Sequence, residues 1–171
     1  MKKNTKVSTT CMLLLCAISF LTTSIIVAQE SSIYRVYDDN QSSNILSRSS
    51  ETRDIPRELL NGLNSAIYVE NSRVINTTGI GRAKVIKLLD SNSIHAINSI
   101  NEVTNNVELL TISLQNMSNL SMSFNMDSLD LPSLRYIYLK CDFDCSESQI
   151  RQFLVNLDPE VTIFYKVLKR S

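Results

Sequence analysis

Short apolar segments that read as β-strands recur along the chain at wide and similar intervals. Ile112, Ile137 and Ile163 each lie in such a segment and are 25 and 26 residues apart, and a similar segment at Ile67 lies 45 residues before Ile112. Strands this far apart do not form hairpins, because hairpin loops are much shorter. A crossover to a neighbouring parallel strand needs about a dozen residues or more. The spacing therefore predicts an α/β fold with a parallel sheet.

The last of these intervals carries the signals of a helix. Ser146 and Gln149 occupy the two positions of a capping box, in which each side chain bonds to the other residue's backbone N–H. Ile150, Phe153 and Leu154 recur at helical spacing and form the predicted buried face. We expect a short repeat-like parallel sheet with right-handed crossover helices, which either curves as a solenoid or stays flat as a small α/β layer.

Two of the repeats share a longer pattern. A leucine stands three residues before the isoleucine, which gives Leu-x-x-Ile-x-Leu-x-Asn from Leu109 to Asn116 and Leu-x-x-Ile-x-Leu-x-Cys from Leu134 to Cys141. With a period inside the range of such repeats, residues 109–167 resemble the leucine-rich-repeat-like exported proteins of Bacteroidetes-type bacteria. The resemblance implies that Asn116 and Cys141 lie near the stacked ladder of Asn or Cys side chains in that family.

The first 28 residues have the parts of a secretory signal peptide in the usual order. Three lysines stand among the first six residues, and an apolar run follows that ends at Ala28. We predict cleavage after Ala28, export to the periplasm or the exterior, and a mature chain that begins at Gln29 without a transmembrane anchor. Residues 29–54 are polar and Ser-rich, which predicts a flexible arm with one short edge strand in Ile-Tyr-Arg-Val-Tyr. Residues 55–171 predict a single α/β domain.

Loss of the signal peptide changes the charge balance. The whole chain has 17 basic and 17 acidic residues, and removing three lysines leaves 14 basic residues and a net charge of −3. An acidic mature chain has no general attraction for nucleic acid or for an anionic membrane. We therefore expect a partner that is a protein or a glycan in the cell envelope or outside the cell.

A short amphipathic helix is expected at the start of the domain. Asp54 can cap it and Pro56 fits its first turn. Leu59, Leu60 and Leu63 would share its buried side.

The Gly79-Ile80-Gly81 turn, followed by Arg82, resembles the second half of a helix-hairpin-helix motif. In that family the Gly-x-Gly turn presents backbone N–H groups to a DNA phosphate, and a helix follows. The helix expected here would bury three apolar residues, Val85, Leu88 and Leu89. A plain Gly-rich loop into that helix explains the same residues, with three cations on its solvated side: Arg82, Lys84 and Lys87.

The mature chain keeps two cysteines, Cys141 and Cys145, in the sequence Cys-Asp-Phe-Asp-Cys. A thioredoxin-type pair is one residue shorter, and acidic neighbours disfavour the thiolate that such a pair needs. A closed zinc site needs four ligands, and only a few residues could complete one: His95, Asp142, Asp144 and Glu147. The alternating acids and serines lack the Gly and the bidentate Glu of an EF-hand loop. In an oxidising compartment we expect a structural disulfide, with free thiols as the alternative.

The function predicted from these features is binding and not catalysis. The single histidine, His95, has no identifiable nucleophile near it in the sequence, and we expect no catalytic residue and no cofactor. Side chains that alternate with the Ile and Leu core point away from it, so Tyr68, Ser113 and Tyr138 are expected to face a partner. The leading hypothesis is an exported non-catalytic interaction module. The alternative is an exported enzyme, or a nucleic-acid-binding protein that uses the Gly-x-Gly turn.

Overall fold

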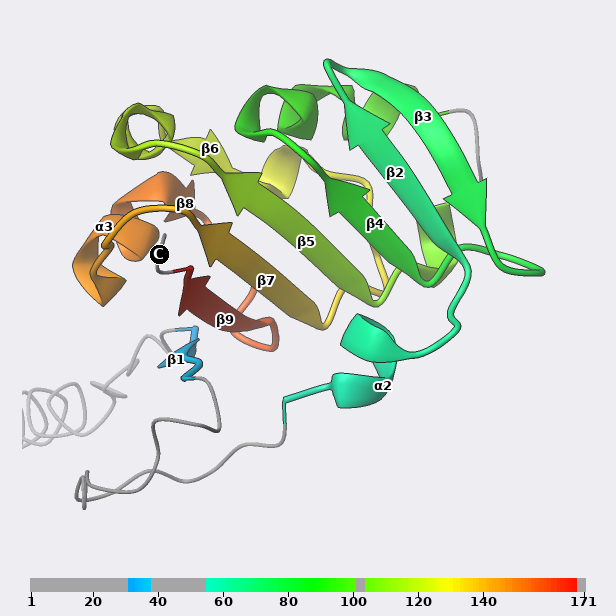
Figure 1. The fold of residues 1–171 in the computed structure, drawn as a ribbon, viewed down its shortest axis with the longest axis horizontal. Coiled ribbons are helices and arrows are strands. Elements are labelled where there is room, and N and C mark those ends of the chain that lie inside the picture. Colours follow the sequence, from blue (N-terminus) through cyan, green and yellow to red (C-terminus); the bar gives the residue numbers. More distant parts are fainter. Residues whose placement is uncertain (1–30, 38–54, 101–103, 169–171) are drawn as a thin grey trace, which may run out of the picture.

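Most strands of the chain form one seven-stranded sheet, in the order β1-β9-β7-β5-β4-β2-β3 (Figure 1). The computed structural model describes residues 31–37, 55–100 and 104–168. Neighbouring strands are parallel except for the antiparallel pair β2–β3. The strands are β1 (Ile33–Arg35), β2 (Ala66–Glu70), β3 (Arg73–Thr78), β4 (Val85–Leu88), β5 (Leu109–Leu114), β7 (Tyr136–Cys141) and β9 (Thr162–Val167). The expected α/β class with a mainly parallel sheet is confirmed.

The strand β1 forms an edge of this sheet. It pairs in parallel with β9, and Ile33 lies opposite Ile163. The edge strand expected near the start of the mature chain is therefore present. The predicted signal peptide and the rest of the predicted arm lie outside the described residues.

The register of the sheet differs from the one suggested by the repeats. Ile137 lies opposite Leu110, whereas Ile112 lies opposite Leu88 and Leu139. The sequence alignment of Ile112 with Ile137 was thus shifted by two residues. A shift of two residues leaves every side chain on the same face of the sheet, so alternation alone could not specify the register.

The ladder implied by the repeat resemblance does not join Asn116 to Cys141. Cys141 ends β7 and lies opposite Leu114 and Val167. Asn116 is exposed beyond the end of β5, and its backbone N–H donates to the Asn119 side chain at 3.0 Å. Asn116 begins the next connection and does not stack in the sheet.

The helix expected after the Gly-x-Gly turn is wrong, because Val85–Leu88 forms the strand β4. Val85 packs on one face of the sheet, and Ile86 and Leu88 pack on the other. A strand buried on both faces shows no polar alternation, and its short apolar run cannot be told from a buried helix by periodicity. This strand lies within the 45-residue interval between Ile67 and Ile112.

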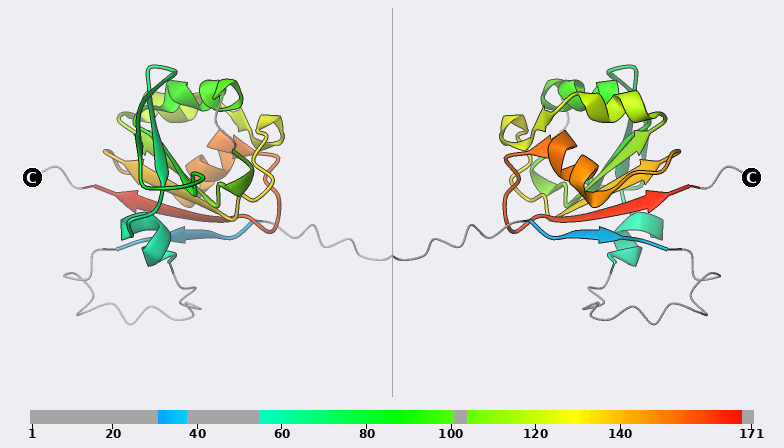
Figure 2. Two further views of the ribbon diagram at one scale, coloured as in Figure 1. Left: turned by 90° about the vertical axis from the view of Figure 1, so that its right-hand side faces the viewer. Right: turned by 90° about the vertical axis from the view of Figure 1, so that its left-hand side faces the viewer.

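The segments that connect the parallel strands pack on one face of the sheet. Their buried side chains, such as Ile97, Phe124 and Ile150, pack in one cluster with the strand side chains that lie on the same face of the sheet as Ile67. Figure 2 shows these connections and the helix α2 on opposite sides of the sheet. The connecting elements are η2 (Ser91–Ser99), η3 (Thr104–Asn106), η4 (Met117–Ser121), β6 (Phe124–Asn125), η5 (Met126–Ser128), α3 (Glu147–Phe153) and β8 (Leu154–Val155), with β6 and β8 paired in a second small sheet.

The helix α3 begins as the sequence predicts. The Gln149 N–H donates to Ser146 Oγ at 3.3 Å, and the Ser146 N–H donates to Gln149 Oε1 at 2.9 Å. Ile150 and Phe153 are buried. Leu154 is also buried, but it lies in β8 and not in the helix. The capping box and the two helical core residues are thus confirmed.

The helix α2 (Arg57–Asn61) packs on the other face of the sheet. Leu59 and Leu60 are partly buried there, as expected. Leu63 is not, because the helix ends at Asn61 and the Leu63 side chain is 105% exposed. The expected three-leucine face therefore has two members.

The connection that leaves β4 is held by Asp90. Its carboxylate accepts bonds from the Ser93 N–H at 2.9 Å, from Ser93 Oγ at 2.8 Å and from the Asn71 N–H at 2.8 Å. Asn71 and Ser72 have positive φ angles in the turn between β2 and β3. Asp90 therefore joins this turn to the start of η2.

Replacing Asp90 by alanine is expected to lower the free energy of unfolding by about 1–2 kcal/mol at pH 7. Burial alone would raise the pKa of Asp90, but the bonds from Asn71 and Ser93 outweigh it and lower the pKa below its ordinary value of 3.8. The stabilisation is therefore complete above that value and is lost as pH falls through the lowered pKa. Urea unfolding at pH 7 and at about pH 3 should show a smaller deficit in acid. Glu160→Ala, at an exposed acid, serves as the control.

Candidate functional site

The face of the sheet opposite the connections, here called the open face, carries three rows of side chains. The Ala66 row is Ala66, Val85, Leu109, Tyr136 and Thr162. The Tyr68 row is Tyr68, Lys87, Thr111, Tyr138, Phe164 and Tyr34. The Lys140 row is Ser113, Lys140 and Lys166.

The open face has a covered part and an accessible part. Leu59 and Leu60 of α2 pack in one cluster with members of the Ala66 row. Lys87 and Lys140, further along the strands, are partly exposed. A ligand would therefore meet the face mainly beyond α2, toward the strand ends.

The three residues predicted to face a partner all lie on the open face. Tyr68 and Tyr138 share one row, and Ser113 lies in the next. Tyr68 and Ser113 are partly exposed, whereas Tyr138 is only 8% exposed. Tyr68 and Ser113 are thus the more accessible of the three, and partner binding by this set stays a prediction.

Lysines give the open face a positive charge. Lys87 Nζ donates to the Tyr68 hydroxyl at 3.3 Å and lies 5.1 Å from the centre of the Tyr68 ring. Burial lowers the pKa of Lys140 below its ordinary value, and the charges of Lys87 and Lys166 also lower it, although Tyr68 opposes this effect. The ion pairs found among the described residues include neither Lys87 nor Lys140. The charge of these two lysines is therefore not neutralised by a neighbouring carboxylate of the described chain.

A buried hydroxyl lies in the middle of the Tyr68 row. Thr111 is 3% exposed, and within the described part of the chain its Oγ1 has no hydrogen-bond partner. The register places it between Lys87 and Tyr138. A buried hydroxyl without a hydrogen-bond partner lowers the free energy of unfolding. Stability alone therefore does not explain a threonine at this position.

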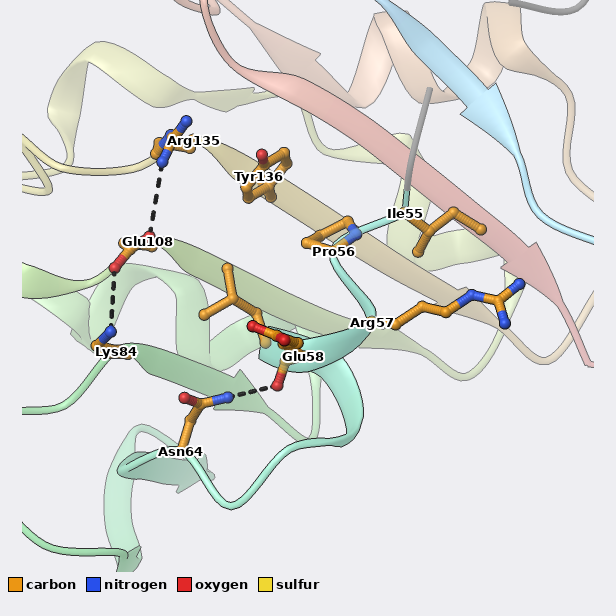
Figure 3. A pocket seen from close by; sticks show the side chains of 10 residues that line it. Ile55, Pro56, Arg57, Glu58, Asn64, Lys84, Glu108, Arg135 and Tyr136 are labelled. Atoms are coloured by element: carbon orange, nitrogen blue, oxygen red, sulfur yellow. Dashed lines mark hydrogen bonds and ion pairs between the residues drawn. The ribbon is translucent and has the colours of Figure 1, made fainter. Parts of the chain in front are cut away.

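A groove of about 730 Å³ lies where α2 crosses the starts of the strands (Figure 3). Glu108 lies between two cations there, 3.7 Å from Lys84 Nζ and 3.9 Å from Arg135 Nη1. The lining residues are Ile55, Pro56, Arg57, Glu58, Leu59, Asn64, Lys84, Glu108, Arg135 and Tyr136. Glu108 therefore has a cation on each side in this groove.

Cys141 and Cys145 are brought together as the sequence suggests. Cys141 ends β7, Cys145 stands just before α3, and their Sγ atoms are 3.0 Å apart in a buried position with both thiols free. The contact with Cys145 and burial raise the pKa of Cys141. The contact with Cys141 lowers the pKa of Cys145, although burial opposes it. A disulfide between them stays a prediction.

Oxidation of the Cys141–Cys145 pair is expected to stabilise the protein by no more than about 2–4 kcal/mol, because the closed loop is short. The purified exported protein should contain no free thiol in a thiol-titration assay. Reduction should lower the melting temperature without changing the circular dichroism spectrum. Two reactive thiols in the unreduced protein would contradict the bridge.

The zinc site considered for these cysteines is not formed by the described residues. His95 is exposed in η2, with its ring edge-on to Phe124 at a centroid distance of 5.4 Å. Within residues 31–37, 55–100 and 104–168, no group of three His, Cys, Asp or Glu side chains could hold a metal ion. The same residues contain no helix that is both long and apolar enough to span a membrane.

The Gly-x-Gly turn leads into a strand and so lacks the helix of the motif it resembles. Gly79 and Gly81 have φ angles of +83° and +91°. The expected cluster of cations is not formed, because Lys84 pairs with Glu108 while Lys87 contacts Tyr68 on the open face. Arg82 is exposed beside the turn, and phosphate binding by Gly79, Gly81 and Arg82 stays a prediction.

Sequence reasoning missed the lysines of the open face, although a signal for them was present. Lys87, Lys140 and Lys166 each interrupt an otherwise apolar strand segment: Val-Ile-Lys-Leu, Tyr-Ile-Tyr-Leu-Lys-Cys and Thr-Ile-Phe-Tyr-Lys-Val. A charged residue in a mostly buried strand must point to an accessible surface or find a partner. Three such lysines in strands of one parallel sheet would have indicated a common charged face.

Comparisons with known proteins do not assign the chain to a family. No family model, curated protein or solved structure matches it.

Proposed function

We propose that this protein is an exported, non-catalytic interaction module that holds its partner on the open face of the sheet. The observation that carries the proposal is the one-sided packing of the connections, which leaves Tyr68, Lys87, Ser113 and Lys140 partly exposed on the other side. Repeat proteins with parallel strands commonly bind partners through such extended surfaces. The one-sided arrangement also supports the leucine-rich-repeat-like character, which remains part of the proposal.

Export is proposed from the sequence of residues 1–28. The lysine-rich start, the apolar run and Ala28 together support cleavage before Gln29. The intact mass of the protein recovered from the periplasm or the medium should correspond to a chain that begins at Gln29. A mass that retains the apolar run would contradict both the cleavage site and the acidic net charge of the mature chain.

Site-specific crosslinking tests whether the open face is the binding surface. A photo-reactive phenylalanine analogue is placed at Tyr68 or at Ser113 in the mature chain, and the protein is exposed to an extract of its native envelope. The matched control carries the same group at Met122, which is 63% exposed and lies beyond η4 in the layer of connections.

The open-face positions should give adducts that excess unlabelled mature protein suppresses, and the Met122 position should not. Adducts formed equally at all three positions, or only at Met122, would show that the open face is not the site.

A further inference from the structure

Three strands each place a lysine on the same part of the open face. Lys140 and Lys166 are direct neighbours on β7 and β9, whose backbones are about 4.8 Å apart. Lys87 lies two strands from β7, at a distance of about 10 Å across the sheet. The lysines thus present positive charges across the strands and not along one of them.

Lys87 and Lys140 have no acidic neighbour within their rows, and Asp142 lies just beyond the end of β7. The Tyr68 row and the Lys140 row contain no acidic residue. Glu70, on the same side of the sheet, lies at the end of β2 and opposite Arg73 of β3. Lys140 is therefore partly buried beside like charges, an arrangement that weakens the fold and that a bound anion would relieve.

We infer that the open face binds an acidic polysaccharide, with Lys87 and Lys140 holding carboxylate or sulfate groups of the polymer. The inference rests on the proposed function and specifies the partner. Ammonium groups recognise anions by charge-assisted hydrogen bonds.

The accessible groups favour a polysaccharide over an acidic peptide. Peptides and proteins are held mainly by apolar and aromatic anchors in pockets, but the apolar members of this face, Val85, Leu109 and Phe164, are buried. Among the described residues, none of the large exposed apolar side chains belongs to the Tyr68 or Lys140 row. What remains accessible in the Tyr68 and Lys140 rows is ammonium and hydroxyl groups and the rings of Tyr68 and Tyr34, which match the charges, hydroxyls and C–H faces of sugars. A peptide that adds a strand would use a sheet edge and not its face.

Binding is measured with the mature chain and four polymers: polygalacturonate, dextran sulfate, uncharged dextran and poly-L-glutamate. The site variant is Lys87→Gln with Lys140→Gln. The matched control is Arg73→Gln with Arg82→Gln, which removes the same charge from exposed residues outside the two rows. Melting temperatures accompany each binding curve, so that a loss of affinity is compared only between folded proteins.

We expect at least one of the two anionic polysaccharides to bind, uncharged dextran not to bind, and salt to weaken the binding by screening. The site variant should bind about tenfold more weakly or worse, whereas the control variant should change affinity much less. An equal loss in the control, or no loss in the site variant, would overturn the inference. So would poly-L-glutamate binding as tightly as the polysaccharides with the same dependence on the lysines.

The two proposals fail in different ways. If crosslinks form at Tyr68 and Ser113 but neither anionic polysaccharide binds, the polysaccharide inference is wrong and the interaction module stands. If crosslinks avoid the open face, the interaction surface itself is wrong.

Discussion

Replacing Gly79 by alanine is expected to lower the free energy of unfolding by about 2–4 kcal/mol. A Cβ at this position would lie 2.6 Å from Ser65 Cα and 2.8 Å from Ser65 N, so the backbone next to β2 would have to move. The φ angle of +83° adds strain for any residue with a side chain. Chemical denaturation of the purified variant measures the loss directly.

Gly81 provides a matched comparison for this prediction. Its φ angle is +91°, but a Cβ there would meet no atom within 4 Å. Gly81→Ala should therefore cost only the conformational strain, about 1 kcal/mol. Equal losses in the two variants would show that close packing against Ser65 is not what requires glycine at position 79.

Replacing Leu139 by alanine is expected to lower the free energy of unfolding by about 2–5 kcal/mol. Leu139 is fully buried in β7, opposite Ile112 on one side and Tyr165 on the other. Its truncation leaves a cavity in the layer between the sheet and the connections, because the neighbouring strands are held by hydrogen bonds on both sides.

Leu63→Ala is the control for the core prediction. The sequence pattern places Leu63 in a buried helix face, yet its side chain is fully exposed. The variant should change stability by less than about 0.5 kcal/mol. A large loss at Leu63 would mean that its side chain packs against something when the protein is in solution.

Local signals predicted the parts of the fold that depend on neighbours in sequence. The Ser146 capping box places the start of α3 because both partners lie within one turn. Wide spacing predicted the parallel strands because no hairpin can span it. The predicted edge strand β1 was found for a similar reason, since its alternation stands out within a polar segment.

Features decided by tertiary contacts were not predicted. In β4, Val85 and Ile86 are buried on opposite faces of the sheet, which removes the alternation that identifies a strand. The helical pattern counted Leu63, although Gly62 ends the helix with its N–H donating to the Glu58 carbonyl at 2.8 Å. The two-residue shift between Ile112 and Ile137 could not be seen in the alternation, because such a shift keeps every side chain on the same face.

The candidate site was predicted in part. Alternation with the core placed Tyr68, Ser113 and Tyr138 together on the face of the sheet opposite the connections. It could not reveal which of them would be covered or which cations would lie beside them. Those properties depend on how α2 packs and on which strands become neighbours. Local sequence patterns predict neither the packing of α2 nor the strand order.

The pairing of β1 with β9 makes one part of this fold depend on the whole chain. The other parallel strands pair with a neighbour one connection away, so their contacts can form while the chain is still growing. Ile33 instead lies opposite Ile163, and the N-terminal segment is further held by the Ile163 N–H donating to Ser32 and by Arg151 donating to Ser31. Bringing such distant segments together loses a large loop-closure entropy before any contact between them can form. Docking of β1 is therefore expected to be the last step of folding, and a chain truncated before β9 would leave its first strand without a partner.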